Sequence, residues 1–130
     1  RAQASKGRKR AKATSEGKFM ANAGLEISVR DLKERLDKGD DIFILDIREA
    51  NELDVAKLNH DLHIPMGELS SRHGELAPHK EKDIVVLCRS GSRSMRCVQF
   101  LRANGYDSAL NLQGGILAWA DEIDSTVQKY

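Results

Sequence analysis

Short apolar runs alternate with amphipathic stretches along most of the chain. Four runs predict strands, at residues 42–45, 62–64, 84–87 and 109–112. The first and third runs are continuously apolar, as expected for parallel strands that are buried on both faces. Since helical patterns separate the runs, the sequence predicts an α/β domain with a mostly parallel sheet.

Apolar residues at helical spacing predict four helices, one before the first strand, two between strands and one after the last strand. Ser28 with Asp31 three residues later marks the start of the first helix, and Gly39 marks its end. The other three are expected at 66–75 before Pro78, from Met95 to about Gly105, and after Gly114 and Gly115.

The formal net charge of +1 conceals an uneven distribution of charge. Residues 1–26 carry seven bases and two acids, a net of +5, whereas the remaining chain carries 14 bases and 18 acids, a net of −4. Since 1–24 holds almost no large apolar side chain, we expect 1–26 to be a disordered basic linker and 27–130 to be one domain. The basic segment lacks interleaved aromatic residues and the domain is acidic, which argues against nucleic-acid binding.

The composition also bears on localisation. No apolar run approaches the ~20 residues that cross a bilayer, and no secretory signal follows the basic start, so we expect no membrane association. The two cysteines, Cys88 and Cys97, are too few for a disulfide framework and favour a reduced, cytoplasmic protein. The chain begins with Arg1 rather than Met, which suggests a fragment of a longer protein.

The strand at 84–87 runs directly into a polar turn. Cys88 ends the strand, and the turn ahead of the next helix consists of Arg89, Ser90, Gly91, Ser92, Arg93 and Ser94. Ligands of open parallel sheets bind at the carboxyl ends of the strands. Because backbone N–H groups of the turn and the helix N-terminus converge there, the turn predicts an anion-binding cradle.

The same turn makes Cys88 the predicted nucleophile. A helix N-terminus and nearby arginines favour the thiolate form of a cysteine, and a thiolate is an activated nucleophile. Arg89 and Arg93 add positive charge, while Gly91 lets the backbone adopt a positive φ. A cysteine with only a structural role would not require this surrounding sequence.

The segment in which the strand at 84–87 leads through residues 88–94 into a helix resembles the active-site loop of rhodanese-like sulfurtransferases. The resemblance covers 27–130, because other marks of the family recur in order. These marks are 44–49 with Glu52, 62–65, and 111–116 with Ala118 and Trp119.

This resemblance implies a five-stranded, mostly parallel sheet flanked by helices on both faces. It also implies that Cys88 takes a sulfane sulfur from a donor, carries it as a persulfide and passes it to a thiophilic acceptor. Thiosulfate or a cysteine desulfurase persulfide is the implied donor. Residues 89–94 would hold the outer sulfur of the persulfide, and no metal or organic cofactor is required.

The C-terminal segment indicates a particular group within this family. Residues 114–119, then 122–124 and Tyr130, are similar to rhodanese domains fused behind ubiquitin-activating-like adenylyltransferases. That similarity implies a ubiquitin-like sulfur-carrier protein as acceptor, with a small thiol as the alternative, and an adenylyltransferase domain in the full-length chain. The products of such proteins serve molybdopterin biosynthesis, thiamine synthesis or tRNA thiolation.

Three charged residues are expected to support the site. Asp46 and Arg48 end the 42–45 strand, and we interpret them as a buried charge pair rather than as substrate contacts. Glu52 is expected to bind Arg93 or a neighbouring loop.

The remaining chemically interesting residues have simpler interpretations. Cys97 is expected to pack as a small apolar side chain, with resolution of the persulfide as the alternative. Trp119 and Tyr130 are expected to pack against the last helix and the end of the chain. The four histidines lack a ligand spacing with the cysteines, so no metal site is expected.

Two other functions use this kind of fold. A phosphatase typically places five residues between the cysteine and the arginine to fit a tetrahedral phosphate, whereas four separate Cys88 from Arg93 here. A non-catalytic rhodanese module for protein binding commonly lacks the cysteine, which is present. Both comparisons favour the sulfurtransferase.

Overall fold

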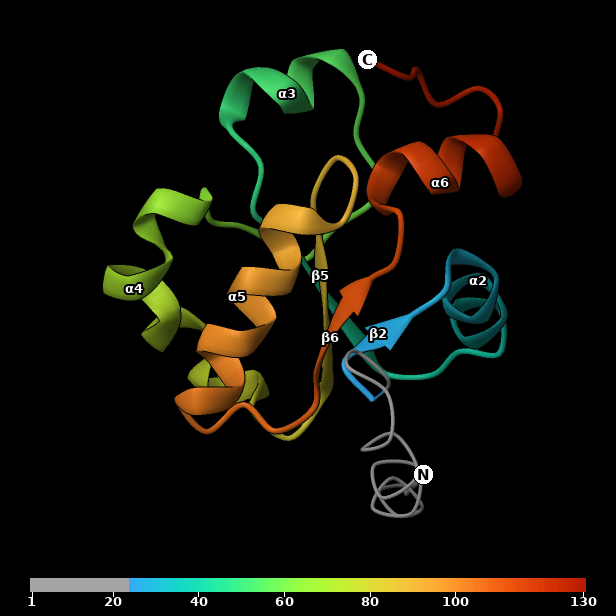
Figure 1. Cartoon of the computed structure of the whole chain (residues 1–130). Coiled ribbons are helices and arrows are strands. Elements are labelled where there is room, and N and C mark those ends of the chain that lie inside the picture. Colours follow the sequence, from blue (N-terminus) through green and yellow to red (C-terminus); the bar gives the residue numbers. More distant parts are fainter. Residues whose placement is uncertain (1–23) are drawn as a thin grey trace.

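The computed structural model describes residues 24–130. Within them, five strands form one parallel sheet in the order β2-β6-β5-β3-β4 (Figure 1). The predicted α/β class and five-stranded parallel sheet are therefore confirmed. The strands are β2 Glu26–Ile27, β3 Ile42–Asp46, β4 Leu62–His63, β5 Asp83–Leu87 and β6 Ala109–Leu112.

Helices cover both faces of this sheet. Figure 1 shows α2 and α6 on one side and α4 and α5 on the other. Across residues 24–130, none of the helices combines the length and the apolar composition that crossing a membrane requires. The helices are α2 Val29–Asp37, α3 Ala50–Val55, α4 Leu69–Arg72, α5 Ser92–Ala103 and α6 Gly115–Glu122, with 3-10 turns η1 Met66–Glu68 and η2 His73–His79.

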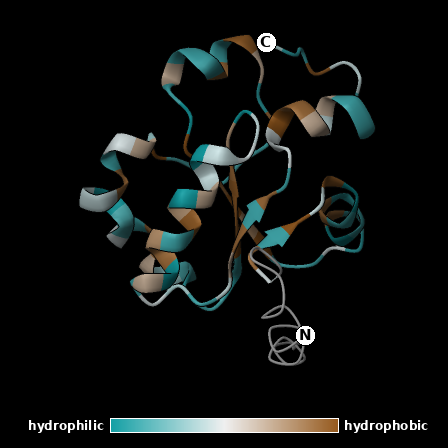
Figure 2. Cartoon of the chain, viewed as in Figure 1, coloured by the Kyte–Doolittle hydropathy of each residue, from teal (hydrophilic) through white to brown (hydrophobic). Residues whose placement is uncertain are grey.

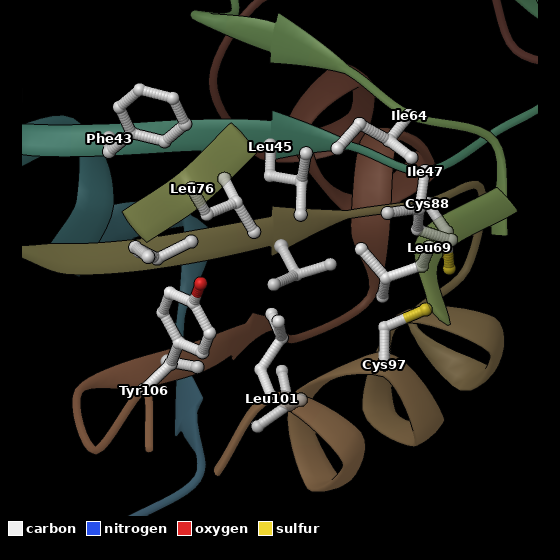
Figure 3. Packing of buried hydrophobic residues seen from close by; sticks show 14 residues of the cluster. Phe43, Leu45, Ile47, Ile64, Leu69, Leu76, Cys88, Cys97, Leu101 and Tyr106 are labelled. Carbon is white, nitrogen blue, oxygen red and sulfur yellow. The ribbon is translucent and has the colours of Figure 1, made fainter. Parts of the chain in front are cut away.

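β5, the central strand, and its neighbour β3 are buried along their whole length. Phe43 and Leu45 contribute to one apolar cluster with Leu101 of α5, which Figure 3 shows, while Ile42 and Ile44 contribute to a second cluster on the opposite face. Successive side chains of a strand point to opposite faces, so burial of both faces requires a continuous apolar run. The brown strands at the centre of Figure 2 show this result.

The start of the domain differs slightly from its predicted boundary. Ser28 caps α2 as predicted, because its Oγ accepts a hydrogen bond of 3.0 Å from the backbone N of Asp31. Glu26 belongs to β2, one residue before the predicted start at Ile27, because it pairs with Asn111 of β6. Residues 1–23 of the predicted linker lie outside the described residues.

The helix predicted over 66–75 is wrong in its form. The segment consists instead of η1, α4 and η2, and Pro78 lies inside η2 rather than beyond the helix. A 3-10 turn is used in short pieces, and a proline, which has no N–H group, opposes a longer regular α-helix through this segment.

The structure adds a short helix, α3, that the sequence pattern did not predict. It contains no buried residue, so it lacks the apolar periodicity on which such a prediction depends. Its start is fixed by a capping box, in which the backbone N of Glu49 donates to Oε1 of Glu52 at 2.9 Å.

Candidate active site

Cys88 follows β5 at the carboxyl end of a central strand and is fully buried. Its Sγ has three hydrogen-bond donors around it: the backbone N of Gly91 at 3.0 Å, the backbone N of Ser94 at 3.4 Å and Oγ of Ser94 at 3.2 Å. All three belong to the loop and the first turn of α5. Because donors surround the sulfur, the arrangement stabilises negative charge on Sγ.

Gly91 gives this loop its shape. Its φ is +102°, a conformation that side chains other than glycine rarely adopt. A Cβ at this position would also lie 3.1 Å from the backbone N of Gly114. The positive φ that the sequence predicted for Gly91 is therefore confirmed.

The start of α6 holds the loop from the other side. The backbone N of Ile116 donates to the carbonyl of Cys88 at 3.0 Å, and that of Leu117 donates to the carbonyl of Arg89 at 3.1 Å. Gly115 makes this approach possible, because a Cβ there would lie 2.5 Å from each of these two carbonyl oxygens. The Gly114 and Gly115 pair is thus a turn in backbone contact with the loop.

Arg93 is occupied by a carboxylate from α3. Its Nη1 and Nη2 each lie 2.8 Å from one carboxylate oxygen of Glu52, which confirms the expected contact. Hydrogen bonding to Arg93 lowers the pKa of Glu52 to about 2, and the same bonds raise the pKa of Arg93. The charge of Arg93 also interacts with Cys88, so this arginine acts electrostatically on both the Glu52 carboxylate and the sulfur.

Tyr130 extends the same network. Its hydroxyl donates to Oε2 of Glu52 at 2.9 Å and accepts from Nη1 of Arg48 at 2.8 Å. The exposed Arg89 donates to the main-chain carbonyl of Tyr130 and lies 5.2 Å from the centroid of its ring. Tyr130 packs against the core cluster as expected, but these polar contacts are an addition to the predicted role.

Asp46 and Arg48 form the buried charge pair that the sequence predicted. Nη2 of Arg48 lies 2.8 Å from Oδ2 of Asp46, and both side chains are fully buried. Burial opposes the charge on Arg48, but hydrogen bonds to Asp46 and Tyr130 outweigh it and raise the pKa of this guanidinium. The pair is connected to the loop indirectly: Arg48 bonds to Tyr130, which bonds to Glu52, and Glu52 is paired with Arg93.

The other loop residues face outward. The side chains of Arg89, Ser90 and Ser92 are exposed, whereas Gly91 and Ser94 are buried beside the sulfur. The predicted cradle therefore has an inner side, which contacts Sγ, and an outer side, which faces solvent.

Cys97 packs in the apolar core, as expected. It lies on α5 in the cluster that Figure 3 shows, and it is 3% exposed. Burial raises the pKa of its thiol to about 11, with a smaller contribution from Cys88. A neutral thiol in apolar surroundings is a weak nucleophile.

Asn111 is a contact of the site that the sequence analysis did not select. Its Oδ1 accepts a hydrogen bond from Oγ of Ser94, and its Nδ2 donates to Oε2 of Glu26 at 3.0 Å. Only 1% of Asn111 is exposed. A buried amide in an otherwise apolar strand was the available signal, because buried polar groups require partners.

Comparison with known proteins identifies the family to which the chain belongs. The family described as Rhodanese-like domain matches residues 28–122. A sulfurtransferase from Allochromatium vinosum is 38% identical over 95 residues, which cover 73% of this chain and 87% of that protein. The rhodanese-like domain protein from Staphylococcus aureus has a solved structure with a TM-score of 0.68 and 28% identity, covering 81% of this chain and 97% of that one.

A longer relative shares only this region. Adenylyltransferase and sulfurtransferase MOCS3 from Arabidopsis thaliana is 34% identical over 118 residues, which cover 80% of this chain and 25% of that protein. The fold, the loop and these matches show that the chain belongs to the rhodanese-like family. Within that family it is a sulfurtransferase.

Proposed function

We propose that Cys88 carries the transferred sulfur as a persulfide and passes it to a thiophilic acceptor. The observation that carries the proposal is the set of three donors around Sγ, from Gly91 and Ser94. A sulfur that alternates between thiolate and persulfide needs stabilisation of negative charge and no proton acceptor of its own. Among the described residues, the hydrogen bonds to Sγ come from two backbone N–H groups and one hydroxyl, and none of these groups is a general base.

The reaction proceeds in two displacements. Cys88 thiolate attacks the sulfane sulfur of the donor, and the donor leaves with the electron pair, as sulfite from thiosulfate or as a thiolate from a persulfide. The acceptor then attacks the outer sulfur, the bond between the two sulfurs breaks, and its electron pair returns to Sγ. Sγ is thus a thiolate at the start and at the end, when Gly91 and Ser94 donate to it.

The two arginines of the loop have different proposed roles. Arg89 is exposed at the outer side of the loop and would attract an anionic donor or acceptor. Arg93, held by Glu52, adds positive potential near Sγ while fixing the start of α5 to α3. Ser90 and Ser92 are exposed on the same outer side and are proposed to contact the incoming group.

The acceptor we propose is a ubiquitin-like sulfur-carrier protein, with a small thiol as the alternative. The similarity to the MOCS3 protein supports this choice, because its name combines adenylyltransferase and sulfurtransferase and this chain covers a quarter of its length. An adenylyltransferase domain in the full-length chain, and a place in molybdopterin biosynthesis or tRNA thiolation, belong to the same proposal. The proposed donor is thiosulfate or a cysteine desulfurase persulfide, in a cytoplasmic setting.

Intact-mass spectrometry after incubation with thiosulfate tests the central step. The wild type should gain about 32 Da, one sulfur atom, and should lose it when cyanide is added. Cys88→Ala should gain nothing, whereas the matched control Cys97→Ala should behave as the wild type does. An adduct of equal amount on Cys88→Ala would overturn the proposal. Turnover of p-nitrophenyl phosphate without any sulfur adduct would favour a phosphatase instead.

A further inference from the structure

The hydroxyl of Ser94 has two acceptors but only one hydrogen. Its Oγ lies 3.2 Å from Sγ of Cys88 and within hydrogen-bonding distance of Oδ1 of Asn111. Ser94 is fully buried and Asn111 is 1% exposed, so solvent cannot take the place of either partner. The hydroxyl can donate to one of the two acceptors at a time.

Glu26 fixes which end of the Asn111 amide faces Ser94. Nδ2 of Asn111 lies 3.0 Å from Oε2 of Glu26. An ionised carboxylate only accepts hydrogen bonds, so it holds the NH₂ end of the amide and leaves the carbonyl end directed at Ser94. The parallel pairing of β2 with β6, in which Glu26 is opposite Asn111, brings the two residues together.

We propose that Asn111 is a positioning residue that sets the charge state of Cys88 by competing with it for the hydroxyl hydrogen of Ser94. In the neutral state the thiol of Cys88 donates to Oγ of Ser94, whose hydrogen is donated to Oδ1 of Asn111. In the thiolate state the thiol proton has left to solvent base, and the Ser94 hydroxyl turns to donate to Sγ. Ser94 keeps its own proton throughout.

This relay has a consequence for sulfur transfer, which rests on the proposed function. When the acceptor takes the outer sulfur, the electron pair of the broken bond stays on Sγ of Cys88. The hydroxyl of Ser94 then turns from Asn111 to the new thiolate and stabilises it as a leaving group. Asn111 therefore favours the neutral thiol, whereas Ser94 favours the thiolate.

Other charged and titratable groups surround the loop and act on Cys88 in parallel. They are constant between the variants compared below, apart from Glu26 where it is itself changed. They are Arg89 in the loop, Arg93 on α5, Glu52 on α3, Tyr130 beside Arg89 and Glu52, Glu26 on β2, and Asp46 with Arg48 at the end of β3. Cys97 on α5 is replaced by alanine in all of these proteins.

The test measures the ultraviolet absorbance of the Cys88 thiolate as a function of pH. Cys97→Ala serves as the background, so that Cys88 is the single thiol, and a Cys88→Ala, Cys97→Ala protein is subtracted to remove tyrosine. Relative to this background, Asn111→Leu should move the midpoint of the profile to lower pH and Ser94→Ala should move it to higher pH. Each shift should be about one pH unit, a tenfold change in the ionisation equilibrium, which one hydrogen bond supplies.

The combination of the two substitutions is the decisive measurement. In a protein that already carries Ser94→Ala, Asn111→Leu should cause no further shift, because the shared hydrogen is gone. Shifts of both single variants in the same direction, or an equal Asn111→Leu shift with and without Ser94, would overturn the proposal.

Glu26→Gln provides a second variant with little change in packing. A glutamine can donate to Oδ1 of Asn111, which lets the amide reverse and directs its NH₂ group at Ser94, so the midpoint should again move to lower pH. An unchanged or raised midpoint in a folded Glu26→Gln protein would count against the relay. The titration needs no sulfur donor, so its failure is distinct from failure of the +32 Da adduct, which concerns the proposed function.

Discussion

The two sides of the loop at 88–94 stabilise charge in different ways. On the inner side, neutral donors of Gly91 and Ser94 contact the sulfur in a buried setting. On the outer side, full charges dominate, but Arg93 is paired with Glu52 and Arg89 with the carbonyl of Tyr130. The direct contacts of Sγ are therefore neutral oriented dipoles, while the ion pair of Arg93 with Glu52 holds the start of α5, which carries Ser94.

The largest expected effect comes from disturbing the backbone contact that both sides share. Gly115→Ala should destabilise the protein by about 3 kcal/mol and abolish sulfur loading, since its Cβ would overlap the carbonyls of Cys88 and Arg89. Urea unfolding and the adduct assay measure the two effects.

Gly39→Ala is the matched control for this substitution. Gly39 also has a positive φ, +83°, but a Cβ there would meet nothing within 4 Å. The Gly39→Ala protein should lose only about 1 kcal/mol of unfolding free energy, because of backbone strain, and should load sulfur normally. Equal losses from both substitutions would mean that strain, and not contact with the loop, explains the role of Gly115.

Acid should weaken the outer side selectively. The pKa of Glu52 is lowered to about 2 in the folded protein from its usual 4.5, so its ion pair stabilises the fold above about pH 4.5 and this contribution is lost as the pH falls towards 2. Glu52→Gln should therefore be about 2 kcal/mol less stable than the wild type at neutral pH. The gap should close in acid, as measured by urea unfolding over a pH series. A gap that stays constant with pH would show that the carboxylate charge is not its source.

The inner side should respond in rate more than in stability. Ser94→Ala removes one of three donors to Sγ and should slow persulfide formation about tenfold at neutral pH. Ser70→Ala, at an exposed position of α4 outside the loop, is the matched control and should slow it less than twofold. Stopped-flow or quenched mass analysis of the first turnover gives both rates. Similar rates for the two variants would contradict a role of the Ser94 hydroxyl at Sγ.

The smallest effect should come from Tyr130→Phe. It removes a hydroxyl that connects Arg48 to Glu52, but leaves both ion pairs in place. We expect a loss of about 1 kcal/mol in unfolding free energy and a nearly unchanged loading rate. A tenfold loss in the rate of sulfur loading would show that the hydroxyl of Tyr130 affects the reactivity of Cys88.

The parts of the site that sequence analysis predicted are local in the chain. Cys88, the positive φ of Gly91 and the helix that follows all lie within a few residues, so a short motif carries them. β3 and β5 were also predictable from the sequence, because a strand that is buried on both faces has an uninterrupted apolar run. Glu52 was expected to bind Arg93 or a neighbouring loop, and the structure shows the contact with Arg93.

The unpredicted contacts join distant parts of the chain. Asn111 meets Ser94 only because β6 lies beside β5, and Tyr130 meets Glu52 across 78 positions of sequence. The single helix expected over 66–75 failed for another reason, since apolar spacing does not separate α-helix from 3-10 turns over so short a segment. Strand order and turn type were therefore the missing information.

The two hydrogen bonds from the start of α6 make the loop observable without any reaction. The amides of Ile116 and Leu117 donate to carbonyls of the loop and not to their own helix. Their hydrogen exchange with solvent therefore requires separation of α6 from the loop, and its rate reports how often that separation occurs. In a ¹⁵N-labelled protein, these two amides would record changes in loop opening when sulfur is loaded on Cys88.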